Sequence, residues 1–402
     1  MKGSSEPLSG SEIYQGCRTP SIHSVLSASS SEPDLTPSSS AREFYEGLRT
    51  PDLSGLSVRS YDTDGVVGVK PKVTLPWYAK TGVSIAARRF TYRELSAATN
   101  NFSPACLLGQ GEFGRVYVGR LWITNQVVAI EQYSNVTEKN QSFLYEASKR
   151  NLLDHPNIVN FIGHCADGNQ RLMVSEYMHL GSLHHHLHHH LHHLQSGERH
   201  LDWNTRMRIA AGVAKGLEYL HEKVNPPLIV HPLKSSNILL EEGYNPKLSD
   251  LGLVKHEFAG DISNTLIDSS GGYDAPECSD RRRPTLKSDI YSFGVVLLEI
   301  ITGLKQSDIR KVAGRDLLSW IFRVNFNQIA DPNLEGQYPE RSFYHALRIV
   351  AMCIQELPIV RPPIAELVRA LTFLASEPYV PGMHPRVQGS SLVLASPPCT
   401  TM

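Results

Sequence analysis

A glycine-rich segment, GQGEFGRV, runs from Gly109 to Val116 and completes a G-x-G-x-x-G-x-V pattern. The runs 109–117 and 127–133 are rich in Val, and a polar turn at 124–126 separates them, so they are predicted as antiparallel strands. Dinucleotide-binding folds place such glycines between a strand and a helix, whereas here they stand among strands. The segment therefore favours a β-hairpin that covers phosphate groups over a Rossmann fold.

The remaining pattern divides into a small strand-rich half and a larger helical half. A short helix is predicted over 90–102, where Leu95, Ala98 and Phe102 have helical spacing and Thr91 with Glu94 fits a capping box. The later apolar periods predict one further strand and several long helices. These lie at 140–153 (helix), 172–178 (strand), and 206–222, 288–302 and 343–355 (helices).

Both ends of the chain are rich in Ser, Pro, Gly and Thr and carry no sustained apolar period. Such segments bury too little apolar surface to offset the entropy lost on ordering. We therefore expect disordered tails at 1–86 and 378–402. The Ser-rich patches of the first tail are either phosphorylation sites or plain linker.

Charge and hydropathy narrow the class of protein. Lys and Arg total 39 against 40 Asp and Glu, a net charge of −1, so no global basic field favours nucleic acid or an anionic membrane. The best apolar run, 293–301, is broken by Glu299, which excludes a transmembrane helix, and the Ser-rich start excludes a secretory signal peptide. The six cysteines show no C-x-x-C spacing and are expected to be reduced thiols.

Four more motifs follow the glycine-rich segment in a defined order: HPLKSSN at 231–237, DLG at 250–252, APE at 275–277 and SDIYSFG at 288–294. With the lead-in FTYRELSAATNNF, this order resembles the plant receptor-like cytoplasmic kinases, in the PBS1-like subgroup, from about residue 90 to residue 374. The resemblance implies an α+β, bilobal serine/threonine protein kinase fold. It places a lead-in helix at 87–101, an N-lobe of antiparallel strands and helix αC at 102–177, and a helical C-lobe at 178–377.

The resemblance also implies an ATP site between the lobes. Two Mg²⁺ ligands of the family match Asn237 and Asp250, so metal-bound ATP remains a candidate, weakly held cofactor. The glycine-rich loop, the adenine face and the hinge would supply the nucleotide-binding residues. These are Gly109, Gly111, Gly114, Val116, Ala129, Glu176 and Met178.

The third strand departs from the family at its phosphate-binding lysine. Relatives read V-A-[IV]-K, and this chain reads Val-Ala-Ile-Glu, ending at Glu131. The αC glutamate is kept as Glu146, so two carboxylates would face each other, which either swings helix αC outward or raises one carboxyl pKa. Arg115 is a poor replacement cation because alternation along the strand points it away from the face of Val116.

The catalytic loop departs as well. The family's H/Y-R-D reads Val-His-Pro here, so Pro232 stands where the aspartate that accepts the substrate proton belongs. His231 removes the arginine that holds a phosphorylated activation loop. Lys234 is retained and can contact a γ-phosphate, but it replaces neither missing group.

The residues that maintain the fold are kept. The resemblance pairs Glu277 of APE with Arg361, and it assigns Asp289 to the backbone of the catalytic loop. Fold-keeping residues survive while phosphoryl-transfer residues are lost, which is the pattern of a pseudokinase.

A histidine-rich run, LHHHLHHHLHHL from Leu183 to Leu194, invites a metal-binding interpretation because His pairs at i,i+4 chelate transition metals. Its four leucines form one helical stripe, which predicts that the histidines lie on the solvated sides. A specific metal site and adventitious nickel or zinc binding both stay open.

The sequence therefore predicts a pseudokinase that acts as an adaptor in signal transduction, with receptor-like kinases as partners and plant immunity as a setting that the family implies. A weakly active ATP-dependent serine/threonine kinase is the alternative, and a decoy for pathogen enzymes is a third hypothesis. The family's Met-Gly myristoylation signal fails because Lys2 follows Met1, although Cys17 is an acylation candidate. We expect a cytoplasmic protein, held through partners or peripherally at the inner face of the plasma membrane.

Overall fold

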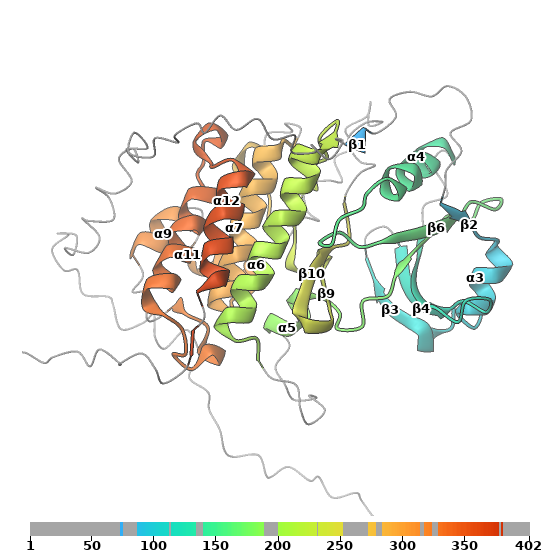
Figure 1. Ribbon diagram of the computed structural model, residues 1–402, viewed down its shortest axis with the longest axis horizontal. Helices are drawn as coiled ribbons and strands as arrows, with labels where there is room; N and C mark the ends of the chain where they lie inside the picture. The colour runs from blue at the N-terminus through green and yellow to red at the C-terminus, as the bar shows by residue number, and fades with distance from the viewer. Residues whose placement is uncertain are drawn as a thin grey trace, which may run out of the picture. The chain divides into compact units, whose positions relative to one another are not determined.

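The computed structural model describes residues 73–74, 87–111, 114–133, 140–188, 200–230, 232–251, 272–278, 284–313, 317–323, 329–377 and 379–380. Both predicted disordered tails lie almost wholly outside these ranges, as do His231 and the second half of the histidine-rich run. No helix within the described ranges combines the length and the apolar character that crossing a bilayer requires. Figure 1 shows the course of the chain.

A mixed sheet of six strands forms the first half of the described fold (Figure 1). Its strands lie in the order β2, β6, β7, β5, β4, β3, antiparallel except for the β2–β6 pair. Their bounds are β2 Arg88–Arg89, β3 Leu107–Gln110, β4 Gly114–Arg120, β5 Val127–Tyr133, β6 Phe161–Cys165 and β7 Leu172–Glu176. The glycine-rich segment spans two strands, with Gly109 in β3 and Gly114 at the start of β4, so our single predicted strand over 109–117 is wrong.

Helices cover the two faces of this sheet. The α3 helix, Tyr92–Ala98, begins with the predicted capping box of Thr91 and Glu94, and its Leu95 packs with Val128 and Ile130 of β5. The α4 helix, Asn140–Asn151, instead packs Phe143 against Met173 of β7. Because side chains alternate along a strand, the odd-numbered positions of β5 face α4 while the even-numbered positions face α3.

The second half is helical, and the order of a small sheet followed by helices confirms the predicted α+β class. Helices α6, α7, α11 and α12 lie side by side in Figure 1. The helices are α5 Leu183–His188, α6 Trp203–Glu218, α7 Leu286–Thr302, α8 Gln306–Ala313, α9 Leu317–Arg323, α11 Glu340–Cys353 and α12 Ile364–Ser376. Short strands β9 Ile238–Glu241 and β10 Asn245–Leu248 form an antiparallel pair, and β1 Val73–Thr74 pairs in parallel with β8 Val224–Asn225.

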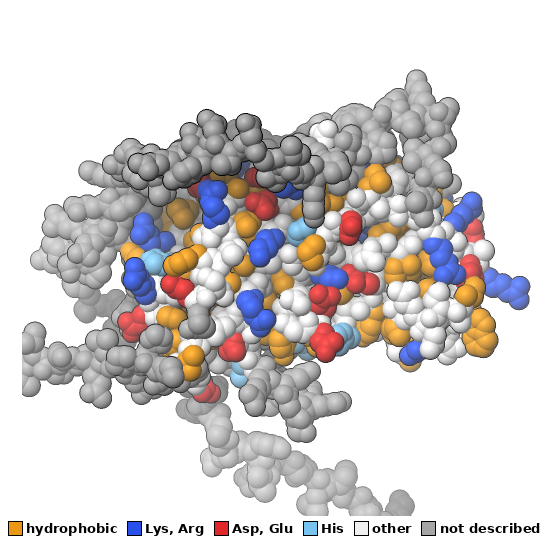
Figure 2. Space-filling model, in the orientation of Figure 1, with side chains coloured by type: hydrophobic (Ala, Val, Ile, Leu, Met, Phe, Trp, Pro, Cys, Tyr) orange, Lys and Arg blue, Asp and Glu red, His pale blue; other side chains and the backbone are white. Residues whose placement is uncertain are grey.

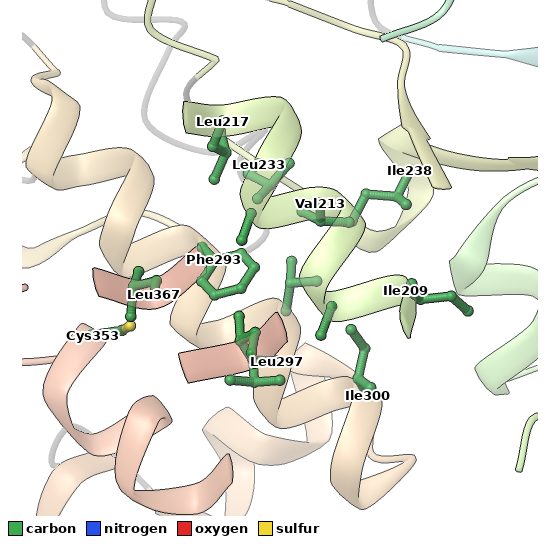
Figure 3. Packing of buried hydrophobic residues seen from close by; sticks show 14 of the residues in the cluster. Ile209, Val213, Leu217, Leu233, Ile238, Phe293, Leu297, Ile300, Cys353 and Leu367 are labelled. Carbon is green, nitrogen blue, oxygen red and sulfur yellow. The ribbon is translucent and has the colours of Figure 1, made fainter. Parts of the chain in front are cut away.

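The α7 helix lies at the centre of the largest hydrophobic cluster. It begins where the Ser288 hydroxyl accepts a hydrogen bond from the backbone N–H of Thr285, and it ends at Gly303, whose φ of 66° few other residues adopt. Phe293, Leu297 and Ile300 of α7 face the apolar side chains of α6 in Figure 3. On the visible face, Figure 2 shows Lys and Arg intermixed with Asp and Glu, in keeping with the near-zero net charge.

The histidine-rich run differs from its prediction at one position. Leu183 and Leu187 are buried as the leucine stripe predicts, but His188 is buried too, with its side chain 0% exposed. The expectation that the histidines lie on solvated sides is therefore wrong for His188. The reason is the short α5 helix, which packs so closely on the helical half that the i+4 neighbour of His184 also faces inward.

Candidate active site

The carboxylate of Glu131 lies on the face of β5 that looks toward α4. The register pairs Glu131 with Val116 of β4 on one side and with Met173 of β7 on the other, so these side chains share a face. Arg115, one position away on β4, is exposed and on the other face, as predicted. The Tyr133 hydroxyl donates a hydrogen bond of 3.2 Å to Glu131 Oε2. Glu131 is therefore fixed among neighbours at the position that the resemblance assigns to a lysine.

Arg150 of α4 lies between the two carboxylates that were expected to repel each other. Its Nη2 is 2.6 Å from Glu146 Oε1, and its Nη1 is 3.7 Å from Glu131 Oε2. The Arg150 side chain is only 10% exposed, and Glu146 is 4% exposed. The outward swing of helix αC is therefore wrong for this chain: a cation supplied by the helix holds the helix glutamate and the strand glutamate together.

The pKa of Glu131 is raised to about 7. Burial is the main cause, Arg150 opposes it, and the carboxylates of Asp250 and Glu146 add to it. The predicted increase in a carboxyl pKa is present, but desolvation contributes more than like charge. The charge of Asp250, an expected Mg²⁺ ligand, thus acts on Glu131.

A pH dependence of stability follows from this raised pKa. The unfolded chain releases the Glu131 proton near pH 4.5 and the folded chain near pH 7, so the folded chain binds more protons between these values. The free energy of unfolding should then fall as the pH rises through this window, by at most about 3 kcal/mol. Urea titrations at pH 5 and pH 8 should show a smaller fall for Glu131→Gln than for the wild type. The exposed substitution Glu222→Gln is the control, and an equal fall in all three proteins would contradict the prediction.

The catalytic-loop segment brings the two expected Mg²⁺ ligands together. Asn237 Nδ2 donates to Asp250 Oδ2 at 3.4 Å, and the Ser249 hydroxyl donates to the Asn237 carbonyl at 3.0 Å. Oxygen donors of this kind suit Mg²⁺. Pro232 precedes them in the loop and offers neither a carboxylate nor an N–H. The two residues that the resemblance expects to bind Mg²⁺ are thus adjacent in the structure, and proline occupies the position where the resemblance expects a general base.

The three glycines of the glycine-rich segment differ in how much space surrounds them. A Cβ on Gly114 would lie 1.9 Å from the Gln132 carbonyl, so the close approach of β4 to β5 excludes a side chain there. At Gly109 and Gly111 a Cβ would meet nothing within 4 Å. Packing within the described chain therefore accounts for Gly114 alone, while open space beside the other two glycines is compatible with a bound phosphate chain.

Comparisons with known proteins match this set of features. The family of protein tyrosine and serine/threonine kinases matches residues 104–371. The chain belongs to the protein kinase family. The probable serine/threonine-protein kinase PBL7 of Arabidopsis thaliana is 53% identical over 323 residues, 78% of this chain and 84% of that protein. The serine/threonine-protein kinase PBS1 of the same plant is 50% identical over 338 residues, 82% of this chain and 72% of that protein.

These relatives confirm the receptor-like cytoplasmic kinase resemblance and the bilobal kinase fold. In kinase terms, β5 is the strand that carries the lysine in other members and α4 is helix αC. At the position of that lysine this chain has Glu131. Its αC helix carries Arg150 one turn after the usual glutamate, Glu146. From the sequence we weighed Arg115 and Lys234 as replacement cations and did not foresee Arg150. The i,i+4 spacing from Glu146 was the available signal.

The side chains of the two hinge residues expected near adenine, Glu176 and Met178, make contacts within the protein. Glu176 Oε1 accepts hydrogen bonds from the Asn160 N–H at 2.7 Å and from Lys247 Nζ at 2.9 Å. Met178 is buried, and Ala129 lies on the Val116 face of the sheet through the β4–β5 register. Ala129 and Val116 therefore share one face of the sheet, and Glu176 ties β7 to β10 of the following lobe.

The fold-keeping contacts expected of a kinase are present. Arg361 Nη1 and Nη2 donate to Glu277 Oε1 and Oε2 at 2.6 Å and 2.7 Å. Burial raises the pKa of Glu277, but the hydrogen bonds and charge of Arg361, together with hydrogen bonds from the Glu277 backbone and from Ser288, hold the pKa below its usual value. Asp289 Oδ2 accepts hydrogen bonds from the Val230 N–H at 2.9 Å and lies 2.8 Å from His221 Nε2. The catalytic-loop backbone is therefore anchored although the loop lacks its base.

Proposed function

We propose that this chain is a receptor-like cytoplasmic pseudokinase, a signalling adaptor that binds its partners through a kinase fold and transfers no phosphate at a useful rate. The observation that carries the proposal is the pair of replacements at the chemical centre: Pro232 at the general-base position and Glu131 at the lysine position. Both lie in a domain that keeps the Glu277–Arg361 ion pair and the hydrogen bond from the Val230 N–H to Asp289.

The loss of the base limits the chemical step. The base accepts the proton of the substrate hydroxyl, and such a group contributes about 10²- to 10⁴-fold to the rate. Lys234 remains in the loop, but an ammonium has no lone pair with which to accept a proton. The proposal therefore does not depend on whether nucleotide binds.

The charge at the phosphate-facing position is also reversed. Glu131 replaces the cation, and the nearest guanidinium, that of Arg150, has its Nη1 3.7 Å from Glu131 while its Nη2 is paired with Glu146. A nucleotide's phosphates would have to compete with two glutamates for this arginine. In return, the cluster of Glu131, Arg150 and Glu146 holds helix αC to the sheet without a ligand, which suits a protein that presents a preformed surface.

Metal-bound ATP, when bound, would supply a transferable phosphoryl group. Asn237 and Asp250 would hold its Mg²⁺, and Gly109 with Gly111 would leave room for its phosphates. These residues fit the nucleotide, whereas Glu131 opposes it. We therefore propose weak nucleotide binding that stabilises the fold.

A weakly active serine/threonine kinase is the second candidate, favoured by the juxtaposition of Asn237 with Asp250. The relatives PBL7 and PBS1 are named as a probable serine/threonine-protein kinase and a serine/threonine-protein kinase. We further propose receptor-like kinases as partners and the inner face of the plasma membrane as the place of action, reached through those partners or peripherally. The acylation candidate Cys17 lies outside the described residues.

One paired experiment separates the two candidates. Purified full-length chain is titrated with ATP, with and without Mg²⁺ or Mn²⁺, in a thermal-shift assay beside a radiolabelled phosphotransfer assay. We expect transfer no greater than that of Asp250→Ala, and any rise in melting temperature with metal and ATP to be absent in that variant. Transfer clearly above the Asp250→Ala control would overturn the pseudokinase proposal.

A further inference from the structure

Two histidines of α5 and a glutamate of α7 converge away from the nucleotide site. His184 and His188 are separated by one helical turn, and their ring centroids are 4.6 Å apart. Glu299 reaches the same place from the last turn of α7, and one ligand atom from each of the three side chains lies within 4.8 Å of the others. His188 and Glu299 are both 0% exposed at the side chain. Glu299 is the residue that interrupts the most apolar run of the sequence.

The His188 ring is oriented so that it offers a lone pair to Glu299. Its Nδ1 lies 3.2 Å from the Gly303 carbonyl, which only accepts hydrogen bonds, so Nδ1 carries the proton. In the neutral ring Nε2 is then an acceptor, and it lies 3.4 Å from Glu299 Oε1 without making a hydrogen bond in the described part of the chain. Two buried acceptors that face each other require a cation between them, either a proton or a metal ion.

The spacing of these acceptors suits a metal ion. Ligand bonds of about 2.1 Å in a tetrahedral zinc site place neighbouring donor atoms about 3.4 Å apart. A histidine that binds zinc commonly donates its other N–H to a backbone carbonyl, as His188 does to Gly303. Two imidazoles with one carboxylate form a donor set that transition metals, zinc above all, prefer over Mg²⁺ or Ca²⁺.

The groups around the cluster hold its ligands in place. The Tyr273 hydroxyl lies 2.9 Å from both carboxylate oxygens of Glu299, and the Gln306 N–H donates to Oε1 at 2.9 Å. The Ser235 hydroxyl lies 3.2 Å from the Tyr273 hydroxyl and 3.3 Å from His184 Nδ1. This network connects α5 and α7 with the catalytic-loop residue Ser235 and with Tyr273. Tyr273 lies near the end of the activation segment, two residues before the APE motif.

We propose that His184, His188 and Glu299 form a zinc site, with a water molecule as the fourth ligand. The ion ties α5 to α7 and, through Tyr273 and Ser235, stabilises the end of the activation segment against the catalytic loop. Its role is structural: it strengthens the helical lobe of a protein that works by presenting a surface. The inference stands whether or not the chain transfers phosphate.

The test must separate this site from the other histidines of the run. The background protein is therefore the full chain in which five of those histidines are replaced, while His186, whose Nε2 lies 2.8 Å from the Leu180 carbonyl, is kept. The five substitutions are His185→Gln, His189→Gln, His190→Gln, His192→Gln and His193→Gln. Zinc is titrated by calorimetry and by competition with a chromophoric chelator, and Co²⁺ serves as a spectroscopic probe of tetrahedral geometry.

We expect the background protein to bind one zinc ion per chain, to show tetrahedral Co²⁺ absorption and to melt at a higher temperature with zinc than with chelator. Adding His184→Gln or Glu299→Gln should abolish stoichiometric binding. Tyr273→Phe should weaken affinity by about 10-fold, because it removes the hydrogen bond that orients Glu299. His184 is partly exposed, so its variant should fold even where His188→Gln does not.

Two results would overturn the proposal. The first is a background protein with no stoichiometric zinc and no zinc-dependent rise in melting temperature, which would mean that a proton bridges His188 and Glu299. The second is zinc binding that His184→Gln and Glu299→Gln leave unchanged. That result would identify an adventitious ion only.

Discussion

Restoring the strand lysine alone should damage this protein. We expect Glu131→Lys to lower the free energy of unfolding by about 3 kcal/mol, because it sets a second buried cation beside Arg150 while Glu146 offers only one carboxylate. Adding Arg150→Leu should recover most of the loss, since the new lysine then takes Glu146 as its partner. Urea denaturation of the two single variants and the double variant forms a double-mutant cycle that measures this coupling.

The matched control for this cycle is Arg115→Leu, which removes an exposed arginine from the neighbouring strand. It should recover none of the loss. If Glu131→Lys and Arg150→Leu prove additive, the cluster of Glu131, Arg150 and Glu146 does not hold helix αC. Phosphotransfer gives a second measurement. The triple variant Glu131→Lys, Arg150→Leu, Pro232→Asp should transfer phosphate about 10²-fold faster than the Asp250→Ala control. A fully active Glu131→Lys, Pro232→Asp double variant would contradict the role of Arg150.

The second large effect is expected at the ion pair between APE and the last helical region. Arg361→Met should lower the free energy of unfolding by about 3–5 kcal/mol, because it leaves the partly buried Glu277 carboxylate without its bidentate partner. Arg361 also donates to the Gln355 carbonyl at 2.7 Å and to the Lys287 carbonyl at 2.9 Å, and these acceptors lose a donor too. Chemical denaturation followed by far-UV circular dichroism measures the change.

Arg361→Lys should fail to restore the pair, because an ammonium cannot reproduce the planar fork that contacts both Glu277 oxygens. Combining Arg361→Met with Glu277→Gln should be less harmful than Arg361→Met alone, since no unpaired charge remains. Arg369→Met, an exposed change on α12, is the control and should have little effect. A loss below about 1 kcal/mol for Arg361→Met would show that this lobe does not depend on the pair.

Residue identity was enough to predict much of the chemistry. Pro232 lacks a base in any conformation, and Asn237 with Asp250 are oxygen ligands wherever the chain places them. Motif order predicted the kinase fold, and local rules predicted the capping box of Thr91 with Glu94 that starts α3. These inferences depend on covalent structure or on residues a few positions apart.

Two features of the structure could not be predicted from the sequence, because they depend on contacts between elements that are distant in the chain. Arg150 neutralises Glu131 only because α4 and β5 meet at an orientation that directs the guanidinium between two carboxylates. His188 faces Glu299 only because α5 packs on α7, more than a hundred residues later in the chain. The identity of each side chain therefore determined which chemistry is available. The packing of helices against strands and helices determined which charges meet and which pKa values change, because electrostatic and desolvation energies depend on distance and burial.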